Sequence, residues 1–213
     1  VAIVYALEQL ARQEGASHIV INSRDNTLGF YQKCGYEVVE EADTVTHPGA
    51  EHQLRKTLTE ENRIIYRPTW CQQLQTTWHE EIPISETMGI RITQYTGRSF
   101  ETCAQLSRNI NVHGTMFAGS IYSLATLTCW GLLHLQLRER ELPGAVVLAD
   151  GNIHYHKPIS REPRAVAKVI DMNGDLSSLQ QGHNARVNLK SQVFDGDKPV
   201  AEFTGQFVVL APK

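Results

Sequence analysis

No residue from Met116 to Leu137 is charged, and this uncharged run limits the possible folds more than any other feature. Its 22 residues are enough to cross a bilayer as a helix. However, the segments on both sides have the alternation of amphipathic strands, and the run contains polar groups on Ser120, Ser123, Thr126, Thr128, His134 and Gln136. We therefore expect no membrane span, but a central helix that is apolar on all sides because other elements surround it.

Segments that are typical of strands predict what surrounds this helix. Six of them lie at 89–95, 99–106, 145–156, 164–170, 184–194 and 200–210. Gly97 marks a turn between the first two, and DGDKP at 195–199 predicts a hairpin between the last two. An amphipathic helix is expected at 70–84, with one side formed by Trp70, Leu74 and Trp78. One long buried helix with about six strands is an α+β pattern.

The first 58 residues predict a smaller group of elements. A helix over 1–17 stops near Gly15, and its apolar stripe consists of Val4, Leu7, Leu10 and Ala11. A short buried strand follows at 18–23. A second helix is capped by Asp25 or Asn26 and ended by Gly35. Further strands are expected at 36–41 and 52–58.

The domain organisation follows from a change in composition. The sequence becomes polar at TEENR, which favours a linker over 59–69 between a first part, 1–58, and a second part, 70–213. Val1 lies within the first expected helix, as the start of a fragment would.

Charge and cysteine content exclude several classes of function. The net charge is -3, and residues 59–213 carry equal numbers of basic and acidic side chains, so we expect no binding to nucleic acid or to an anionic membrane. The four cysteines are scattered without a CxxC motif or a His/Cys cluster, so neither a zinc knuckle nor a disulfide framework is predicted. A cytoplasmic protein with reduced thiols is expected.

The segment ARQEGASHIVINSRDNTLGFYQKCGYEVV resembles the C-terminal half of the GNAT (Gcn5-related) N-acetyltransferase fold. The residues that match the motif of that half are Asn26, Phe30, Tyr31, Lys33, Gly35 and Tyr36. The resemblance implies that Asn26 lies near the CoA cofactor and that Tyr31 protonates the departing thiolate, although Tyr31 is equally a candidate core aromatic. The family's pyrophosphate loop, R/Q-x-x-G-x-G/A, would precede Val1, so we expect no acetyltransferase activity from this chain.

The segments NINVHGTMFAGSIYSLATLTCWG and VVLADGNIHYHKPI resemble the hotdog domain of bacterial GNAT/hotdog fusion proteins, a family of acetyltransferase/thioesterases that includes malonyl-acyl carrier protein decarboxylases. The resemblance implies an antiparallel sheet that wraps a long central helix over residues 70–213. It also implies a homodimer or higher oligomer, because hotdog folds usually pair an edge strand between subunits.

The same resemblance places an acyl-thioester site at the start of the central helix. The backbone N–H groups of Ala118, Gly119 and Ser120 would bind and polarise the thioester carbonyl. In the usual hotdog motif, G-G-x-x-x-x-L-A-D, the last residue is the hydrolytic acid, and Thr126 occupies that position here. We expect the Thr126 hydroxyl only to satisfy a nearby helix carbonyl.

A neutral threonine is not a general base at pH 7, whereas decarboxylation of a malonyl thioester needs only a polarised carbonyl and a dry pocket. Asn111 is the predicted amide donor to the enolate, although it could instead satisfy its own turn. Thr115 and His113 are predicted to orient the carboxylate or to return a proton, although His113 is equally a candidate exposed loop residue. Asp150 is a candidate for the rim of the site.

Three functions therefore remain open: a malonyl-thioester decarboxylase that supplies acetyl groups for fatty acid synthesis, an acyl thioesterase with a displaced base, and a non-catalytic acyl-binding module. The carrier would be CoA or the phosphopantetheine of acyl carrier protein, and the hotdog chemistry needs no further cofactor. An acidic carrier protein needs a basic rim, and the candidates, which could equally be solvated surface, are Lys157, Arg161, Arg164 and Arg186.

Two segments contain residues typical of metal ligands, but neither predicts a metal site. Asp150, Asn152, His154 and His156 alternate, so a strand would place them on one face, but a His-x-His pair without a third spaced ligand favours a hydrated or dimer-facing surface. DMNGDLSSLQQG begins like a calcium loop, but Leu176 stands where glycine is required and Gly182 where the bidentate glutamate is required.

Overall fold

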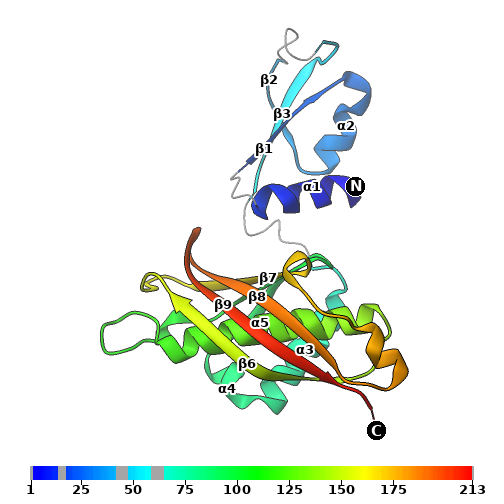
Figure 1. The fold of residues 1–213 in the computed structure, drawn as a ribbon. Helices are drawn as coiled ribbons and strands as arrows, with labels where there is room; N and C mark the ends of the chain where they lie inside the picture. The colour runs from blue at the N-terminus through cyan, green and yellow to red at the C-terminus, as the bar shows by residue number, and fades with distance from the viewer. Residues whose placement is uncertain (1, 14–17, 42–47, 59–64, 213) are drawn as a thin grey trace. The chain divides into compact units, whose positions relative to one another are not determined.

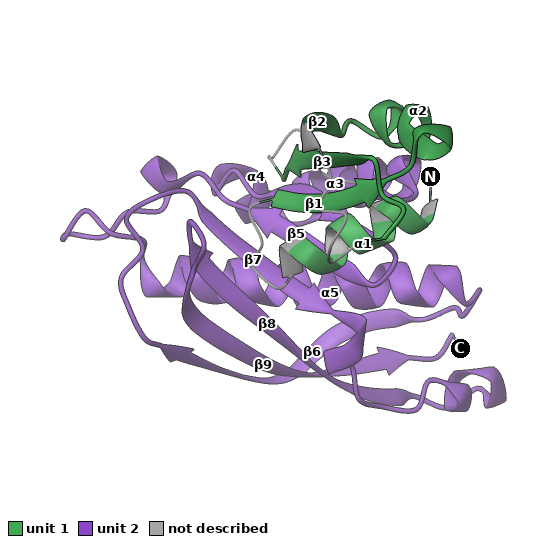
Figure 2. Ribbon diagram, turned by 90° about the horizontal axis from the view of Figure 1, so that it is seen from above, with its two compact units in different colours: residues 1–64 green, residues 65–213 purple. Residues whose placement is uncertain are grey.

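The computed structural model describes residues 2–13, 18–41, 48–58 and 65–212, and the chain divides into two units, residues 1–64 and 65–213 (Figure 2). The division falls inside the linker expected at 59–69, of which residues 59–64 lie outside the described part. Gly15, the expected end of the first helix, also lies outside the described part. The first helix of the second unit begins at Pro68, so the end of the expected linker is helical.

Unit 1 is a three-stranded antiparallel sheet with two helices. Its strands are β1 (His18–Ser23), β2 (Glu37–Glu41) and β3 (His52–Thr57), in the order β1-β3-β2, and its helices are α1 (Ala2–Gln13) and α2 (Asp25–Lys33). A small core of Cys34, Tyr36 and Leu54 holds them together. The predicted elements are therefore present, but β1 is not a buried strand, since His18 and Val20 are exposed.

The predicted apolar stripe of α1 is wrong at two of its positions. Leu7 and Leu10 are 56% and 53% exposed, whereas Glu8 is fully buried. A buried carboxylate needs a charged partner, and Lys56 of β3 supplies one, with Nζ 3.0 and 3.1 Å from the two Glu8 carboxylate oxygens. Because Glu8 turns inward to meet this lysine, the neighbouring leucines face outward.

The start of α2 also differs from the prediction. The N-cap residue is Arg24 rather than Asp25 or Asn26, and its side chain makes no capping bond. Instead, the Asp25 backbone N–H donates to a carboxylate oxygen of Glu51 over 2.6 Å, so a residue distant in sequence satisfies the helix end. The end of the helix agrees with the prediction, because Gly35 follows it with a φ of +85°, which favours glycine.

Unit 2 is a six-stranded antiparallel sheet with a long helix against one face, which confirms the α+β prediction. The strands are β4 (Arg91–Tyr95), β5 (Ser99–Cys103), β6 (Ala145–Tyr155), β7 (Pro163–Lys168), β8 (Ala185–Asp195) and β9 (Lys198–Leu210), and their order is β4-β5-β7-β8-β9-β6. The helix is α5 (Ala118–Glu139), and Figures 1 and 2 show it between the sheet and the shorter helices α3 (Pro68–Glu81) and α4 (Pro83–Thr87). Short 3-10 helices lie at Leu106–Arg108, Val169–Asp171 and Ser177–Gln181.

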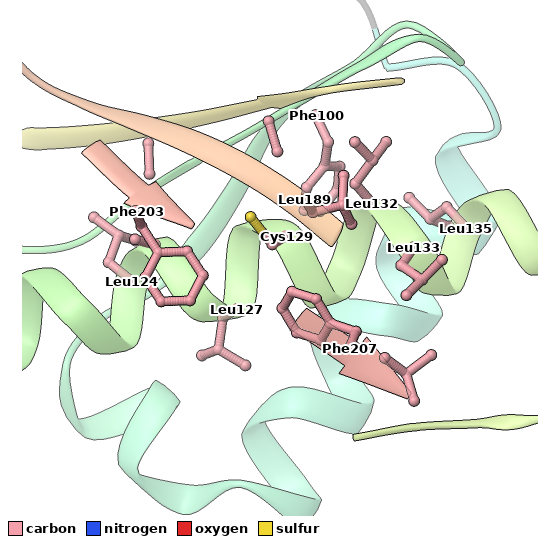
Figure 3. Packing of buried hydrophobic residues seen from close by; sticks show 14 of the residues in the cluster. Phe100, Leu124, Leu127, Cys129, Leu132, Leu133, Leu135, Leu189, Phe203 and Phe207 are labelled. Carbon is pink, nitrogen blue, oxygen red and sulfur yellow. The ribbon is translucent and has the colours of Figure 1, made fainter. Parts of the chain in front are cut away.

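The core of unit 2 surrounds α5, as the uncharged run predicts. Figure 3 shows leucines of the helix packed among residues of the sheet, and the fully buried members of this group include Phe100, Leu124, Cys129, Leu132, Leu133, Leu135, Phe203 and Phe207. On the other side, Trp78 of α3 is fully buried and its ring lies 6.4 Å from that of Trp130. Burying each such side chain contributes about 1.5–3 kcal/mol.

In the described residues no helix is long and apolar enough to span a membrane.

Strand β6 forms one edge of the sheet. It pairs with β9 on one side, from Ala145 opposite Leu210 to Tyr155 opposite Ala201, and among the described residues no strand pairs with its other side. Its side chains are largely exposed, including Val147 and Tyr155. An 11-residue edge strand of this kind presents a row of free backbone groups.

Candidate functional site

The first turn of α5 begins without a side-chain cap. The N-cap residue, Phe117, provides no side-chain acceptor, and the first backbone bond of the helix runs from the Ile121 N–H to the Phe117 carbonyl over 3.1 Å. Within the described residues, the N–H groups of Ala118, Gly119 and Ser120 have no acceptor. The positive end of the helix dipole adds to these three donors, so the geometry suits a carbonyl oxygen or an anion.

Gly119 allows an aromatic ring to lie across this turn. A Cβ at position 119 would come within 2.4 Å of Cε1 of Phe117, a distance that real side chains do not reach. Phe117 is 55% exposed, so its ring forms an apolar wall beside the free N–H groups. The position therefore requires glycine as long as Phe117 keeps this orientation.

Asn111 lies in the loop before α5, and its side chain bonds to that loop. Its Nδ2 donates to Oγ1 of Thr115 (3.1 Å) and to the Met116 carbonyl (3.4 Å), while its Oδ1 accepts the His113 N–H (2.9 Å) and the Thr115 N–H (3.3 Å). The amide thus folds the loop around itself and leads the chain into Phe117, whose N–H donates to the Asn109 carbonyl over 2.7 Å.

The three residues predicted to be catalytic are brought together by this loop. Asn111 and Thr115 are half-buried and bonded to each other, and His113 is exposed at the turn between them. Asp150 is exposed on β6, where its carboxylate accepts the N–H of Gly151 over 2.9 Å. In the described residues no hydrogen bond or ion pair joins the Asp150 side chain to the loop.

Thr126 corrects one expectation. Its hydroxyl oxygen is buried but has no hydrogen-bond partner among the described residues, so it does not satisfy a helix carbonyl. The nearby Thr128, by contrast, donates to the Leu124 carbonyl over 2.7 Å. Thr126 therefore keeps an unpaired hydroxyl at the position that the sequence resemblance aligns with the acid of the usual hotdog motif.

Two residues that sequence reasoning missed touch the first turn. The Tyr155 hydroxyl, on β6, donates to the Ala118 carbonyl, and the Ser123 hydroxyl donates to the Gly119 carbonyl, each over 3.0 Å. Tyr155 is 47% exposed, and partial desolvation raises its pKa above the ordinary value near 10, so the hydroxyl is protonated at neutral pH with or without this shift. A serine four residues after a helical glycine was a signal for the second bond, but nothing local in the sequence indicates the first.

The predicted basic rim is partly neutralised. Arg164 donates to the Glu101 carboxylate over 2.8 Å, and Arg161 lies 3.7 Å from Asp195. Arg186 bonds to the amide of Gln206 (3.3 Å), and Lys157 is exposed.

In unit 1, the two predicted cofactor residues have different environments. Asn26 is exposed in the first turn of α2, whereas Tyr31 packs edge-on against Phe30 and Tyr36, with ring centroids 5.2 and 6.0 Å away. These ring contacts support the interpretation of Tyr31 as a core aromatic.

The His-x-His pair on β6 does not gather metal ligands. His154 is exposed and His156 lies beyond the end of the strand. Across the described residues, the ligand atoms that converge, within 4.8 Å of one another, belong to Asp25, Glu51 and His52 in unit 1. There, however, Glu51 caps α2 and the His52 ring bonds to the Asp25 carboxylate.

Comparisons with known proteins agree with this fold. The family model described as "Putative thioesterase (yiiD_Cterm)" matches residues 71–211. A crystal structure titled "putative thioesterase" from Shewanella oneidensis is 40% identical, covers 67% of this chain and 99% of its own, and superposes with a TM-score of 0.64. A protein of unknown function from Chlorobaculum tepidum is 26% identical over 67% of this chain and 94% of its own, with a TM-score of 0.61.

A more distant structure agrees in fold alone. A mutant thioesterase from Pseudomonas aeruginosa is 19% identical over 66% of this chain and 93% of its own, with a TM-score of 0.54. The matched segment contains α5, the six strands and the loop that carries Asn111. By its fold and by the match over residues 71–211, the chain belongs to the hotdog thioesterase family described as "Putative thioesterase (yiiD_Cterm)".

Proposed function

We propose that unit 2 decarboxylates a malonyl thioester to the acetyl thioester that starts fatty acid synthesis. One observation carries the proposal: the first turn of α5 offers three free N–H donors, while the place of the hydrolytic acid holds Thr126, which has no carboxylate. A polarised carbonyl without a general base suits a reaction that needs no activated water.

The reaction breaks the bond between the carboxylate carbon and the α-carbon of the malonyl group. Carbon dioxide leaves, and the electron pair of the broken bond stays on the α-carbon and delocalises into the thioester carbonyl to form the enolate. The N–H groups of Gly119 and Ser120 stabilise the negative charge on the thioester oxygen. Removing one such donor typically costs about 3–4 kcal/mol of transition-state stabilisation. The Phe117 ring helps to exclude water from the departing carboxylate.

Asn111 is the proposed side-chain donor to the enolate. Its bond to the Met116 carbonyl is long, at 3.4 Å, so a substrate oxygen can take that place while Thr115 continues to hold the amide. His113 is exposed beside it and is the proposed source of the proton that returns to the α-carbon, with Asp150 at the rim.

Hydrolysis of an acyl thioester is the second candidate, since the family and its Shewanella relative are described as thioesterases. It would require a base other than residue 126. The third candidate, a non-catalytic acyl-binding module, would use the same helix end without turnover.

The remaining proposals concern the setting of the reaction. CoA or acyl carrier protein is the carrier, bound through phosphopantetheine. A second copy of the chain pairs with the open edge of β6, which supports a homodimer. Cys34, Cys71 and Cys129 are free thiols, which supports a cytoplasmic location. Unit 1 is the C-terminal portion of a GNAT domain, with Asn26 and Tyr31 at its cofactor side.

Product analysis separates the three candidates. Incubation with malonyl-CoA and with malonyl-acyl carrier protein, followed by mass spectrometry, is expected to give carbon dioxide and the acetyl thioester. Release of free thiol would favour the thioesterase, and no product would favour the binding module.

Asn111→Ala tests the site within the same assay. We expect kcat to fall by roughly a hundredfold or more with little change in affinity, because the amide acts on the transition state. Thr126→Val is the comparison variant, with activity within a few-fold of the parent. A folded Asn111→Ala protein that decarboxylates at the parent rate would contradict the assignment, and circular dichroism would check that the loop change leaves the fold intact.

A further inference from the structure

Two hydroxyl groups donate to consecutive carbonyls in the first turn of α5. The Tyr155 hydroxyl reaches the Ala118 carbonyl from β6, and the Ser123 hydroxyl reaches the Gly119 carbonyl from the next turn of the helix, each over 3.0 Å. In an α-helix these carbonyls already accept the N–H four residues later. The hydroxyls are therefore additional donors, which the helix itself does not require.

Each of these carbonyls shares a peptide group with one of the free N–H donors. The Ala118 carbonyl belongs to the peptide that carries the Gly119 N–H, and the Gly119 carbonyl to the peptide that carries the Ser120 N–H. A hydrogen bond to the oxygen of a peptide polarises the whole group and makes its N–H a stronger donor. The two hydroxyls thus act on two of the three N–H groups that have no acceptor in the described residues, those of Gly119 and Ser120.

The arrangement also fixes the direction of the donors. Tyr155 is 37 residues from Ala118 in sequence and is held in register by its pairing with Ala201 of β9. Its bond therefore ties the helix end to the sheet and limits rotation of the first peptide planes. The hydroxyl is a donor at neutral pH, because the ordinary pKa of a tyrosine is near 10 and partial desolvation raises that of Tyr155 further.

We propose that Tyr155 and Ser123 are positioning residues of the acyl-thioester site, which strengthen and orient the Gly119 and Ser120 N–H groups for the thioester carbonyl. This inference rests on the proposed function, because it assumes that the carbonyl binds at this helix end. It applies equally to decarboxylation and to hydrolysis, since both reactions place negative charge on the same oxygen.

The test compares Tyr155→Phe and Ser123→Ala with the parent. Each variant removes one hydroxyl and keeps the remaining side-chain carbons. We expect kcat to fall about threefold to tenfold with KM unchanged, because a stronger N–H donor matters most when the oxygen is charged. Ser123→Thr restores a hydroxyl and should recover most of the loss.

Tyr122→Phe is the matched control, because Tyr122 is a half-buried tyrosine near the same end of α5 whose ring packs on Phe203 and whose hydroxyl makes no hydrogen bond in the described residues. It should keep the parent kcat. Melting temperatures of all variants show whether a loss of rate reflects loss of fold.

A spectroscopic readout makes the test independent of turnover. The probe is acetyl-phosphopantetheine in which a methylene replaces the thioester sulfur and the carbonyl carbon is ¹³C. Bound to the parent, its carbonyl stretch should shift to lower frequency, and Tyr155→Phe should lose part of that shift. If the parent turns over substrate but Tyr155→Phe equals it in kcat and carbonyl frequency, the positioning role is wrong. If the parent neither reacts with malonyl thioester nor binds the probe, the proposed function fails and the inference fails with it.

Discussion

The two ends of α5 satisfy their backbone groups in opposite ways. At the C-terminal end, the Leu142 N–H donates to the Leu137 carbonyl (2.9 Å), and the Arg140 side chain donates to the Gln136 carbonyl (3.1 Å). At the N-terminal end, no side chain caps the helix, and three N–H groups have no acceptor in the described residues.

Under the proposed function, the closed end serves stability and the open end serves binding. Capping bonds typically contribute about 1 kcal/mol each, so the open end gives up stability that the closed end keeps. At the open end, the Tyr155 and Ser123 hydroxyls act on carbonyls rather than on the free N–H groups. The side chains there support the donors without occupying them.

The largest expected effect is a loss of activity on substitution at the open end of α5. Gly119→Ala places a Cβ where the Phe117 ring now lies, so the ring must turn away and uncover the donors. Because small displacements in a site have large effects on rate, we expect kcat/KM to fall by about tenfold to a hundredfold. The melting temperature should change little, since alanine is the better helix former.

Arg140→Ala is the reciprocal variant at the closed end. It removes the bond to the Gln136 carbonyl, so we expect a loss of about 1 kcal/mol in the free energy of unfolding and parent-like kinetics. The contrast between the ends would break down if Arg140→Ala reduced kcat/KM as much as Gly119→Ala does.

A second prediction concerns two threonines on the helix between these ends. Thr128 shares a hydrogen bond with Thr102 (2.7 Å) and donates to Leu124, so Thr128→Val leaves the Thr102 hydroxyl buried and unpaired at a cost of about 1–3 kcal/mol. Thr126→Val removes a buried hydroxyl that has no partner and should stabilise the protein by up to about 1 kcal/mol. Urea denaturation of both variants measures the difference, and equal changes of the same sign would refute it.

The smallest effect is a dependence on pH at the closed half of the helix. His134 stacks on Trp130, with ring centroids 5.1 Å apart, and burial, followed by the charge of Arg138, lowers its pKa. The unfolded chain therefore binds a proton more readily than the folded one, so stability should fall as the pH drops below about 6.5. Measuring the free energy of unfolding from pH 8 to pH 5 for the parent and His134→Gln should give a shallower slope for the variant.

The sequence predicts most of the fold of unit 2 because each signal is local. The uncharged run ends where Arg138 begins, and α5 ends one residue later, at Glu139. Alternation along β8 likewise matches its alternating burial. The α1 stripe was wrong for a physical reason: Glu8 is buried by Lys56, a partner 48 residues away that no local pattern reveals.

The candidate site is less predictable, because its geometry depends on contacts across the fold. The free N–H groups could be placed from the helix start alone, but the bond between Tyr155 and Ala118 requires the register of β6 against β9. The preference of Asn for turns predicts the loop bonds of Asn111 as an alternative, whereas the unpaired hydroxyl of Thr126 has no local signal, since it depends on which neighbours do not reach it.

The position of β6 at the sheet edge has a consequence for folding during synthesis. During synthesis β6 leaves the ribosome before its pairing partner, since about forty residues separate Tyr155 from Lys198 at the start of β9. At 5–20 residues per second, the interval is roughly 2–9 s. During this interval the apolar surface of α5 and the unpaired strand β6 are exposed together on the nascent chain. We therefore expect a chaperone that binds exposed apolar segments to act mainly in this interval.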